Sequence, residues 1–204
     1  MINITPKYTE TNQTHIELRK HIDSIWPKNK KKEYAYEDSK FTKFLPNWRV
    51  IEIAPSKARE PWVYISLGTW ELTKDELYEA GRYGIDFLIT SPEQNLIHLK
   101  NLAWVAFFHA DPKYRLYLGD TMDIGDPWMP NATCDHFLVS YPHPFPDELE
   151  TIKINDIYVS FWWLVPITAK ELEYANSDGV EALETLLEKN RVDSVDICES
   201  GVQK

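Results

Sequence analysis

The segment spanning residues 157–190 constrains the fold more than any other part of the chain. It begins with IYVSFWWLV, in which large apolar side chains fall on both faces of an extended strand. A strand that is apolar on both faces lies inside a sheet whose two surfaces are covered. Because Pro166 has no N–H to donate to a neighbouring strand, the sequence predicts that this strand ends there.

Two capped helices are predicted after this strand. Thr168 and Glu171 have the spacing of a capping box, in which each side chain accepts a hydrogen bond from the backbone of the other residue. Asp178 and Glu181 repeat this spacing ahead of the last helix. The end of the chain is therefore expected to be a central strand followed by two helices, with no evident catalytic group.

Upstream, helices and strands alternate without a regular rhythm. The predicted helices cover residues 11–25, 73–81 and 91–111. The predicted strands cover residues 48–54, 62–69, 85–89, 115–118 and 137–141. Residues 28–33 are expected to be a charged connection. Since no βαβ rhythm is present, the sequence predicts one α+β domain over residues 1–204, with a mixed β-sheet flanked by helices.

Two blocks of this sequence resemble one known family. LVPITAKELEYANSDGVEALETLLEKN is similar to the C-terminal hallmark of the suppressor-of-fused domain family, in which an apolar-Pro-Ile-Thr run meets a helix with an early Glu. YLGDTMDIGDPWMPNATCDHFLVSYPHPF resembles the Gly-Thr-rich segment, Gly-x-Pro-Trp loop and Leu-Val-Ser-x-Pro strand of the same family. The likeness covers residues 62–196, and residues 1–60 match more loosely. It implies a suppressor-of-fused-like fold and a binding function.

The resemblance also implies the kind of partner. Animal members sequester a transcription factor and carry an additional C-terminal domain that this chain is too short to hold. Stand-alone bacterial members are commonly immunity proteins, which neutralise a cognate toxin that is often a nuclease. The expectation is therefore an immunity (antitoxin) protein that covers the active site of a toxin. The alternative is a non-enzymatic interaction adaptor, and the residues themselves do not separate the two.

The net charge of −10 is distributed unevenly along the chain. Residues 1–60 hold 12 Lys and Arg against 8 Asp and Glu, a net charge of +4. Residues 61–204 hold 10 against 24, a net charge of −14. A negative field repels nucleic acid and anionic membranes and steers a cationic partner, such as a basic nuclease domain. Many cytosolic proteins, however, are acidic for solubility alone.

Length and cysteine content favour a single domain in the cytoplasm. A chain of 204 residues buries enough surface to fold without a metal or a disulfide. No apolar run approaches the roughly 20 residues of a membrane span, and the N-terminus lacks the pattern of a secretory signal. Two cysteines, Cys134 and Cys198, are too few for a disulfide framework.

Catalytic patterns are missing from the sequence. It contains no GxGxxG, phosphate loop, GxSxG or HExxH motif, and no pair of histidines spaced for a metal ion. We therefore expect a protein that is not an enzyme, with no catalytic residues, no metal and no cofactor. A metal-dependent hydrolase that combines an acidic loop with His136 or His143 remains a third possibility.

The acidic loop in question contains Asp120, Asp123 and Asp126, followed by Trp128. The spacing of the three carboxylates differs from the alternating ligands of an EF-hand loop. We interpret the loop as a partner-binding surface in which an exposed Trp128 is an aromatic anchor surrounded by carboxylates. The competing interpretations are a solvated turn and a weak divalent-metal site.

The remaining aromatic and basic residues are given structural roles. Trp162 and Trp163 are expected in the core, on opposite faces of the last strand. Four more tryptophans are expected to be buried or half-buried: Trp48, Trp62, Trp70 and Trp104. The basic run KNKKK at residues 28–32 could contact a phosphate or an acidic partner, although such runs are more often solvated loops.

Overall fold

The computed structural model describes residues 13–35, 45–73, 77–78, 81–143 and 145–189. The helices are α1 (Gln13–Ile25), α2 (Ile97–Ala110), α3 (Ala169–Asp178) and α4 (Val180–Lys189), and the 3-10 turns are η2 (Thr69–Leu72), η3 (Pro112–Tyr114) and η4 (Asp147–Leu149). The strands are β1 (Lys31–Ala35), β2 (Arg49–Ile53), β3 (Trp62–Leu67), β4 (Leu77–Tyr78), β5 (Gly81–Ser91), β6 (Thr121–Asp123), β7 (His136–Ser140), β8 (Thr151–Ile154) and β9 (Ile157–Ile167).

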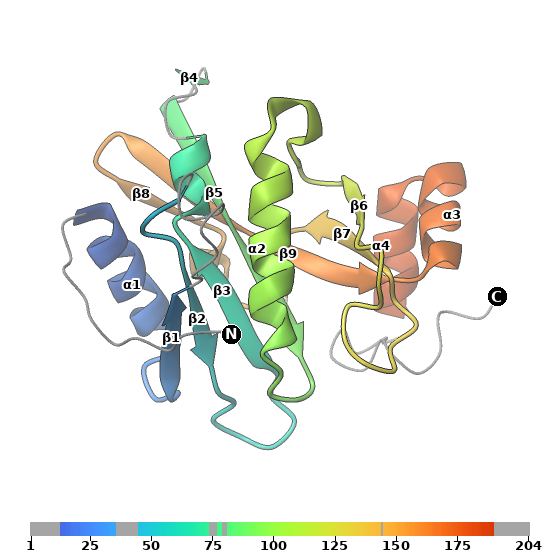
Figure 1. The fold of residues 1–204 in the computed structure, drawn as a ribbon, viewed down its shortest axis with the longest axis horizontal. Helices are drawn as coiled ribbons and strands as arrows, with labels where there is room; N and C mark the ends of the chain where they lie inside the picture. Colours follow the sequence, from blue (N-terminus) through green and yellow to red (C-terminus); the bar gives the residue numbers. More distant parts are fainter. Residues whose placement is uncertain (1–12, 36–44, 74–76, 79–80, 144, 190–204) are drawn as a thin grey trace.

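The nine strands found in the described ranges all belong to one mixed sheet (Figure 1). Its main path runs β1-β2-β3-β5-β9-β7-β6, with β4 paired to β5 and β8 paired to β9. The pairing of β5 with β9 is parallel, and every other pairing is antiparallel. The predicted α+β class, a mixed sheet flanked by helices, is confirmed. No helix in the described ranges is long and apolar enough to cross a membrane.

β9 lies between β5 and β7, as its two-sided apolar pattern predicts. It pairs with β5 from Ile157 to Trp163 and with β7 from Trp163 to Ile167. The strand continues through Pro166, where the sequence predicted its end. Because the pairing with β5 stops at Trp163, one side of β9 needs no N–H donors beyond that residue, and a proline is tolerated there.

Different helices cover the two faces of the sheet. Phe161 of β9 lies on the face toward α1, where His21 stacks on it with ring centroids 6.2 Å apart. The neighbouring pair Phe87 and Trp162 points to the opposite face, because side chains alternate along a strand. There Phe87 meets His109 of α2 at a centroid distance of 5.3 Å. In Figure 1, α2 accordingly runs across the front of the sheet.

α2 begins later than its capping pattern predicts. Ser91 is the last residue of β5, where it pairs with Trp62, and its hydroxyl donates a hydrogen bond to the carbonyl oxygen of Glu93. Strand pairing therefore removes Ser91 from the helix, which starts only at Ile97. The end of α2 agrees with the sequence, since Asp111 is its C-cap.

Several short segments also differ from the prediction. Residues 31–35 are the edge strand β1 and not a loop connection. The described part of the predicted helix at residues 73–81 contains β4, and residues 115–118 form no strand. The strands β6 and β8 were not predicted. Pairing with other strands determines these segments, and a local pattern does not record such pairing.

The connection from β9 to the last two helices is largely as predicted. Thr168 Oγ1 accepts a hydrogen bond from the Glu171 N–H at 3.3 Å, and Glu171 Oε2 accepts one from the Thr168 N–H at 2.7 Å. The second predicted cap is wrong, because Asp178 is the last residue of α3. Gly179, with φ of 95°, separates α3 from α4.

A buried carboxylate fixes the turn between β3 and η2. Asp86 of β5 is fully buried and accepts hydrogen bonds from Ser66 Oγ and from the Thr69 N–H, both at 2.8 Å. Gly68, at φ of 117°, donates a third bond at 3.3 Å. Burial raises the pKa of Asp86 to about 7, against the opposing effect of these hydrogen bonds.

Candidate protein-binding surface

Trp104 and Phe107 lie on the solvent-facing side of α2. Their side chains are separated by about one helical turn and are 51% and 49% exposed. The two rings stack, with centroids 6.4 Å apart and planes inclined by 20°. Large aromatic side chains exposed side by side are characteristic of surfaces that bind other proteins.

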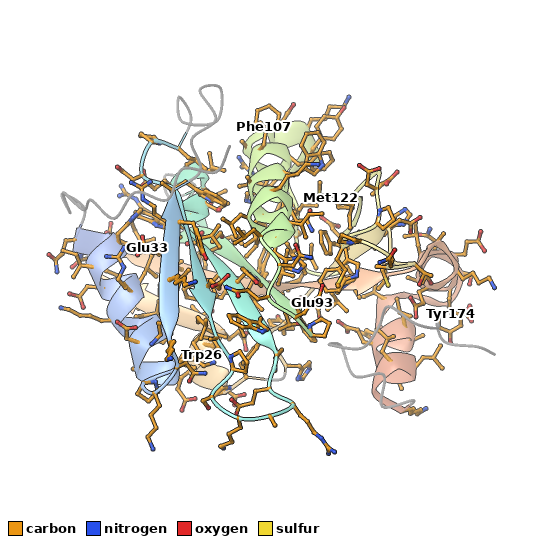
Figure 2. All side chains as sticks on the ribbon, turned by 60° about the horizontal axis from the view of Figure 1, so that its bottom comes forward. Trp26, Glu33, Glu93, Phe107, Met122 and Tyr174 are labelled. Carbon is orange, nitrogen blue, oxygen red and sulfur yellow. The ribbon has the colours of Figure 1, made fainter. Side chains whose placement is uncertain are left out.

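α2 is largely apolar, on its outer side as well as on the side that faces the sheet. Its sequence IHLKNLAWVAFFHA contains one Lys and no Asp, Glu or Arg. A helix with this pattern is normally covered on all sides. Here one side packs on β3 and β5, and Figure 2 shows Phe107 at the upper end of the helix, pointing away from the sheet. Within the described part of the chain, the outer side of α2 remains exposed to solvent.

The exposed aromatic area continues past the end of α2. Tyr114 of η3 packs against Phe108 with ring centroids 5.0 Å apart, and its own side chain is largely exposed. The Nζ atom of Lys113 lies 5.0 Å from the centre of the Tyr114 ring. We define the α2 aromatic surface as Trp104, Phe107, Phe108 and Tyr114.

Trp128 does not have the position that the sequence analysis gave it. It is fully buried, and its ring packs against His98 of α2 at a centroid distance of 5.0 Å. The prediction of an exposed Trp128 is therefore wrong. Trp104, which was predicted to be buried or half-buried, has a side chain that is 51% exposed. The spacing of Lys100, Trp104 and Asp111 on one helical face, with a charge at each end, was the sequence pattern that could have placed Trp104 outside.

The three predicted acidic residues have different roles. Asp120 Oδ2 accepts a hydrogen bond from the Tyr117 N–H, and Asp123 Oδ1 accepts one from the Gly125 N–H, both at 2.7 Å. These two carboxylates therefore shape turns, as the solvated-turn interpretation expected. Asp123 and Asp126 are exposed, so they contribute negative charge to the surface.

Two buried imidazoles lie on the sheet side of α2. His98 packs between the rings of Tyr64 and Trp128, and neither of its ring nitrogens has a hydrogen-bond partner among the described residues. His109 Nδ1 accepts a hydrogen bond from the Leu116 N–H at 3.1 Å. Burial lowers the pKa of His98 to about 3 and that of His109 to about 4. Both rings are therefore neutral near pH 7.

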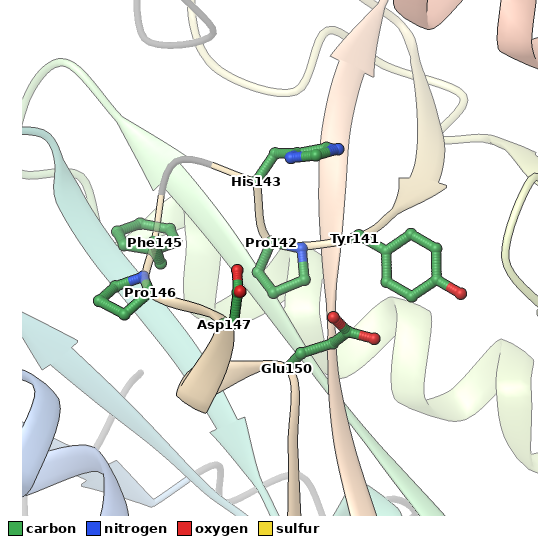
Figure 3. Close-up of a pocket in the computed structure, with 7 residues that line it drawn as sticks. All are labelled: Tyr141, Pro142, His143, Phe145, Pro146, Asp147 and Glu150. Atoms are coloured by element: carbon green, nitrogen blue, oxygen red, sulfur yellow. The ribbon is translucent and has the colours of Figure 1, made fainter.

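A pocket of about 180 Å³ after β7 contains several ionisable groups. His143, Asp147 and Glu150 contribute to its lining, and Figure 3 shows them spread around it without converging on one point. His136, the other candidate, lies 2.7 Å from a carboxylate oxygen of its neighbour Asp135. Across the described ranges, no three His, Cys, Asp or Glu residues are arranged to hold a metal ion.

The chain matches one protein family over most of its length. The family model of Suppressor of fused protein (SUFU) matches residues 46–198. A SUFU homolog from Neisseria gonorrhoeae FA 1090 has a similar structure, with a TM-score of 0.78 and 30% identity. That match covers 93% of this chain and 97% of the gonococcal chain. A search of curated proteins found no match.

Two further solved structures share the fold at lower identity. Drosophila Suppressor of Fused matches with a TM-score of 0.67 and 16% identity, over 89% of this chain and 49% of the Drosophila chain. A Sufu–Fu complex matches with a TM-score of 0.58 and 17% identity, over 85% of this chain and 83% of that one. The extent of the family match, together with the gonococcal structure, shows that this chain belongs to the suppressor of fused protein family.

Proposed function

We propose that this chain is a protein-binding domain that contacts its partner through the α2 aromatic surface. The observation that carries the proposal is the stacked, half-exposed pair of Trp104 and Phe107 on the outer side of a largely apolar helix. Stacked rings lose little conformational freedom when a partner covers them, and their burial provides a large hydrophobic contribution to binding. Binding by such a surface requires no catalytic group.

Family membership supports a binding function. One of the similar structures is a Sufu–Fu complex, in which a protein of this fold is associated with another protein. Its identity of 17% supports the comparison at the level of the fold. For the present chain, a protein partner is therefore the conclusion that best unites the exposed surface with the family.

We further propose that the partner is a cognate toxin with a cationic nuclease domain, so that the chain is an immunity protein of the cytoplasm. The net charge of −14 over residues 61–204 supports this class of partner. Asp111, the C-cap of α2, is exposed, and so are Asp123 and Asp126 in the loop whose Trp128 carbonyl accepts a hydrogen bond from Asn101 of α2. An acidic surface with an aromatic patch suits a basic partner, because exposed charges provide steering and the aromatic side chains provide affinity.

The main alternative is an interaction adaptor that binds a protein other than a toxin. It uses the same surface, and the identity of the partner distinguishes the two functions. A metal-dependent hydrolase is the weaker alternative, since the described residues contain no group suited to a metal. Activity of the purified protein that depends on an added divalent ion would favour the hydrolase.

The decisive experiment tests the chain against a cationic nuclease-toxin domain taken from a gene that neighbours its own. We expect a stoichiometric complex and complete loss of nuclease activity. Trp104→Ala should weaken the complex, whereas Tyr141→Ala, which removes an exposed aromatic ring outside α2, should not. Failure to bind at micromolar concentration would contradict the immunity function. Tight binding that is unaffected by Trp104→Ala would retain the function and exclude this surface.

A further inference from the structure

A second candidate site lies on the opposite face of the sheet from α2. It is a cleft of about 510 Å³ between the end of α1, the turn after β2 and the ring of Phe145. Ile53 and Val63, which are register partners in β2 and β3, form its floor. Tyr64 points toward His98 of α2, so its neighbour Val63 points to the other face. The volume is within the range of sites that bind ligands in other proteins.

The walls of the cleft are aromatic. Trp26 and Phe145 meet edge to face, with ring centroids 5.3 Å apart and planes inclined by 70°. Both rings are partly buried against the core, so each retains an accessible surface. The Trp26 N–H continues the hydrogen bonding of α1 by donating to Ile22 O at 3.1 Å. The cleft therefore offers a preformed apolar slot, and we call it the Trp26 cleft.

The turn beside the cleft is held by one carboxylate. Glu60 Oε2 accepts hydrogen bonds from the N–H and the hydroxyl of Ser56 and from the Lys57 N–H, at 2.9, 2.8 and 3.1 Å. These bonds lower the pKa of Glu60, so it stays ionised near neutral pH. Its role at the rim is thus structural, and its other oxygen lies 3.8 Å from Lys57 Nζ.

Lysines determine the charge at the rim. Lys31 donates to the carbonyl oxygen of Trp26 and forms an ion pair with Asp23, so its charge is already compensated. Lys28 lines the cleft and is exposed, and the described residues provide it with no ion-pair partner. Lys57 also lines the cleft, with a side chain that is 81% exposed. Among the described residues that line the cleft, Glu60 alone carries a carboxylate, and the rim therefore favours an anion.

We propose that the Trp26 cleft binds an acidic peptide segment of a second partner protein. A bulky apolar side chain of the segment occupies the slot beside Trp26 and Phe145, and a neighbouring Asp or Glu of the segment pairs with Lys28. The cleft lies in the part of the chain that carries the positive charge, since residues 1–60 have a net charge of +4. An acidic segment is attracted here and repelled by the acidic remainder, which gives the cleft its selectivity.

This site differs from the α2 aromatic surface in position and in partner chemistry. The two sites lie on opposite faces of the sheet. The α2 aromatic surface suits a cationic protein, and the Trp26 cleft suits an acidic segment. Occupation of one therefore does not block the other, and the chain can join two proteins. The KNKKK run, which sequence patterns alone leave as a solvated loop, contributes Lys28 to this site and Lys31 and Lys32 to β1.

The test uses the full chain labelled with nitrogen-15 and the blocked peptide acetyl-ELFE-amide, followed by NMR. We expect saturable shifts of the Trp26 indole N–H and the Lys57 amide. The charge-reversed peptide acetyl-KLFK-amide and the apolar-free peptide acetyl-ESSE-amide should bind at least about tenfold more weakly. Lys28→Glu should weaken binding of the first peptide by about fivefold or more, because it places a like charge at the rim.

Lys32→Glu is the matched control, because Lys32 is exposed on β1 and does not line the cleft. It makes the same change in net charge and should alter the affinity by less than about twofold. Equal weakening by both variants would mean that the net charge of the protein, and not Lys28 itself, determines the affinity for the peptide. That result would overturn the proposal. So would equal binding of the charge-reversed peptide, or unshifted Trp26 and Lys57 signals. Binding of free 3-phenylpropionate as tight as that of the peptide would make the cleft a small-acid site and also overturn it.

Discussion

The side-chain amide of Asn101 donates a hydrogen bond to the main-chain carbonyl oxygen of Trp128 at a distance of 2.7 Å. Asn101 is buried on the inner part of α2, and Trp104 lies on the exposed part of the same helix. The contact therefore fastens the loop that carries Asp123 and Asp126 to the helix that presents the aromatic surface. The acidic and aromatic parts of the proposed interface are held together by a buried hydrogen bond, so neither needs a partner in order to be positioned.

The different burial of the two tryptophans leads to opposite expectations for stability. Trp128→Ala should lower the free energy of unfolding by about 3–5 kcal/mol, because it empties a fully buried site. Trp104→Ala should change it by less than about 0.5 kcal/mol, because the ring is half exposed. Urea unfolding of both variants measures the difference. A large loss from Trp104→Ala would show that this ring stabilises the isolated domain and would weaken its assignment to an interface.

The position of β9 and the burial of Trp128 show what sequence patterns can and cannot predict. The apolar alternation of residues 157–165 records burial on both faces, so the central position of β9 could be predicted. The burial of Trp128 depends on His98 and Asn101, which lie far away in the sequence and belong to another element. A pattern confined to the Asp120–Trp128 loop carries no information about that contact. The Trp26 cleft was missed for the same reason, because Phe145 reaches Trp26 across more than a hundred residues.

The buried His98 should make the protein sensitive to acid. Its pKa is about 3 in the folded chain and about 6.5 when unfolded, so the unfolded state binds more protons between these values. The free energy of unfolding therefore falls as the pH decreases through this window, by up to about 1.4 kcal/mol per unit. His98→Phe should remove this loss and keep the contacts with Tyr64 and Trp128.

Thermal unfolding at pH 7, 5 and 4 tests this expectation. The stabilisation of His98→Phe relative to the original chain should increase as the pH decreases. His143→Phe is the control, since His143 is exposed and its replacement should give no such trend. A stabilisation that is the same at all three pH values would show that packing, and not protonation, accounts for the effect.

Asp86 should produce a dependence of the opposite sign. Its pKa is raised from 3.8 to about 7 by burial, so the folded chain binds a proton that the unfolded chain has released between these values. Its contribution to the free energy of unfolding therefore decreases as the pH rises from about 4 to about 7. Asp86→Asn removes this proton linkage but also replaces one acceptor oxygen by a donor, which opposes the N–H group of either Gly68 or Thr69.

The comparison between the original chain and Asp86→Asn should therefore be made as a function of pH. The variant is expected to be less stable at pH 4, where the folded original chain keeps a proton on Asp86 that the variant cannot bind. The difference between the two should become smaller toward pH 7. Asp147→Asn, an exposed substitution, serves as the control and should show no comparable trend. A difference that is independent of pH would mean that Asp86 stays ionised in the folded chain.

The proposed complex with a cationic toxin domain should respond differently to loss of charge and loss of the aromatic anchor. Asp126→Lys places a like charge at the rim and should slow association, since Asp126 is exposed. Trp104→Ala should mainly accelerate dissociation, because it removes an anchor from the packed centre.

Raising the ionic strength from 0.01 M to 0.15 M shortens the range of the electrostatic field from about 30 Å to about 8 Å. It should therefore reduce the effect of Asp126→Lys but not that of Trp104→Ala. Glu173→Lys makes the same charge change on α3, which Figure 1 shows well apart from α2, and should slow association much less. Surface-immobilised binding kinetics over a salt series measure all three variants, and equal slowing by both lysine substitutions would place the interface away from α2.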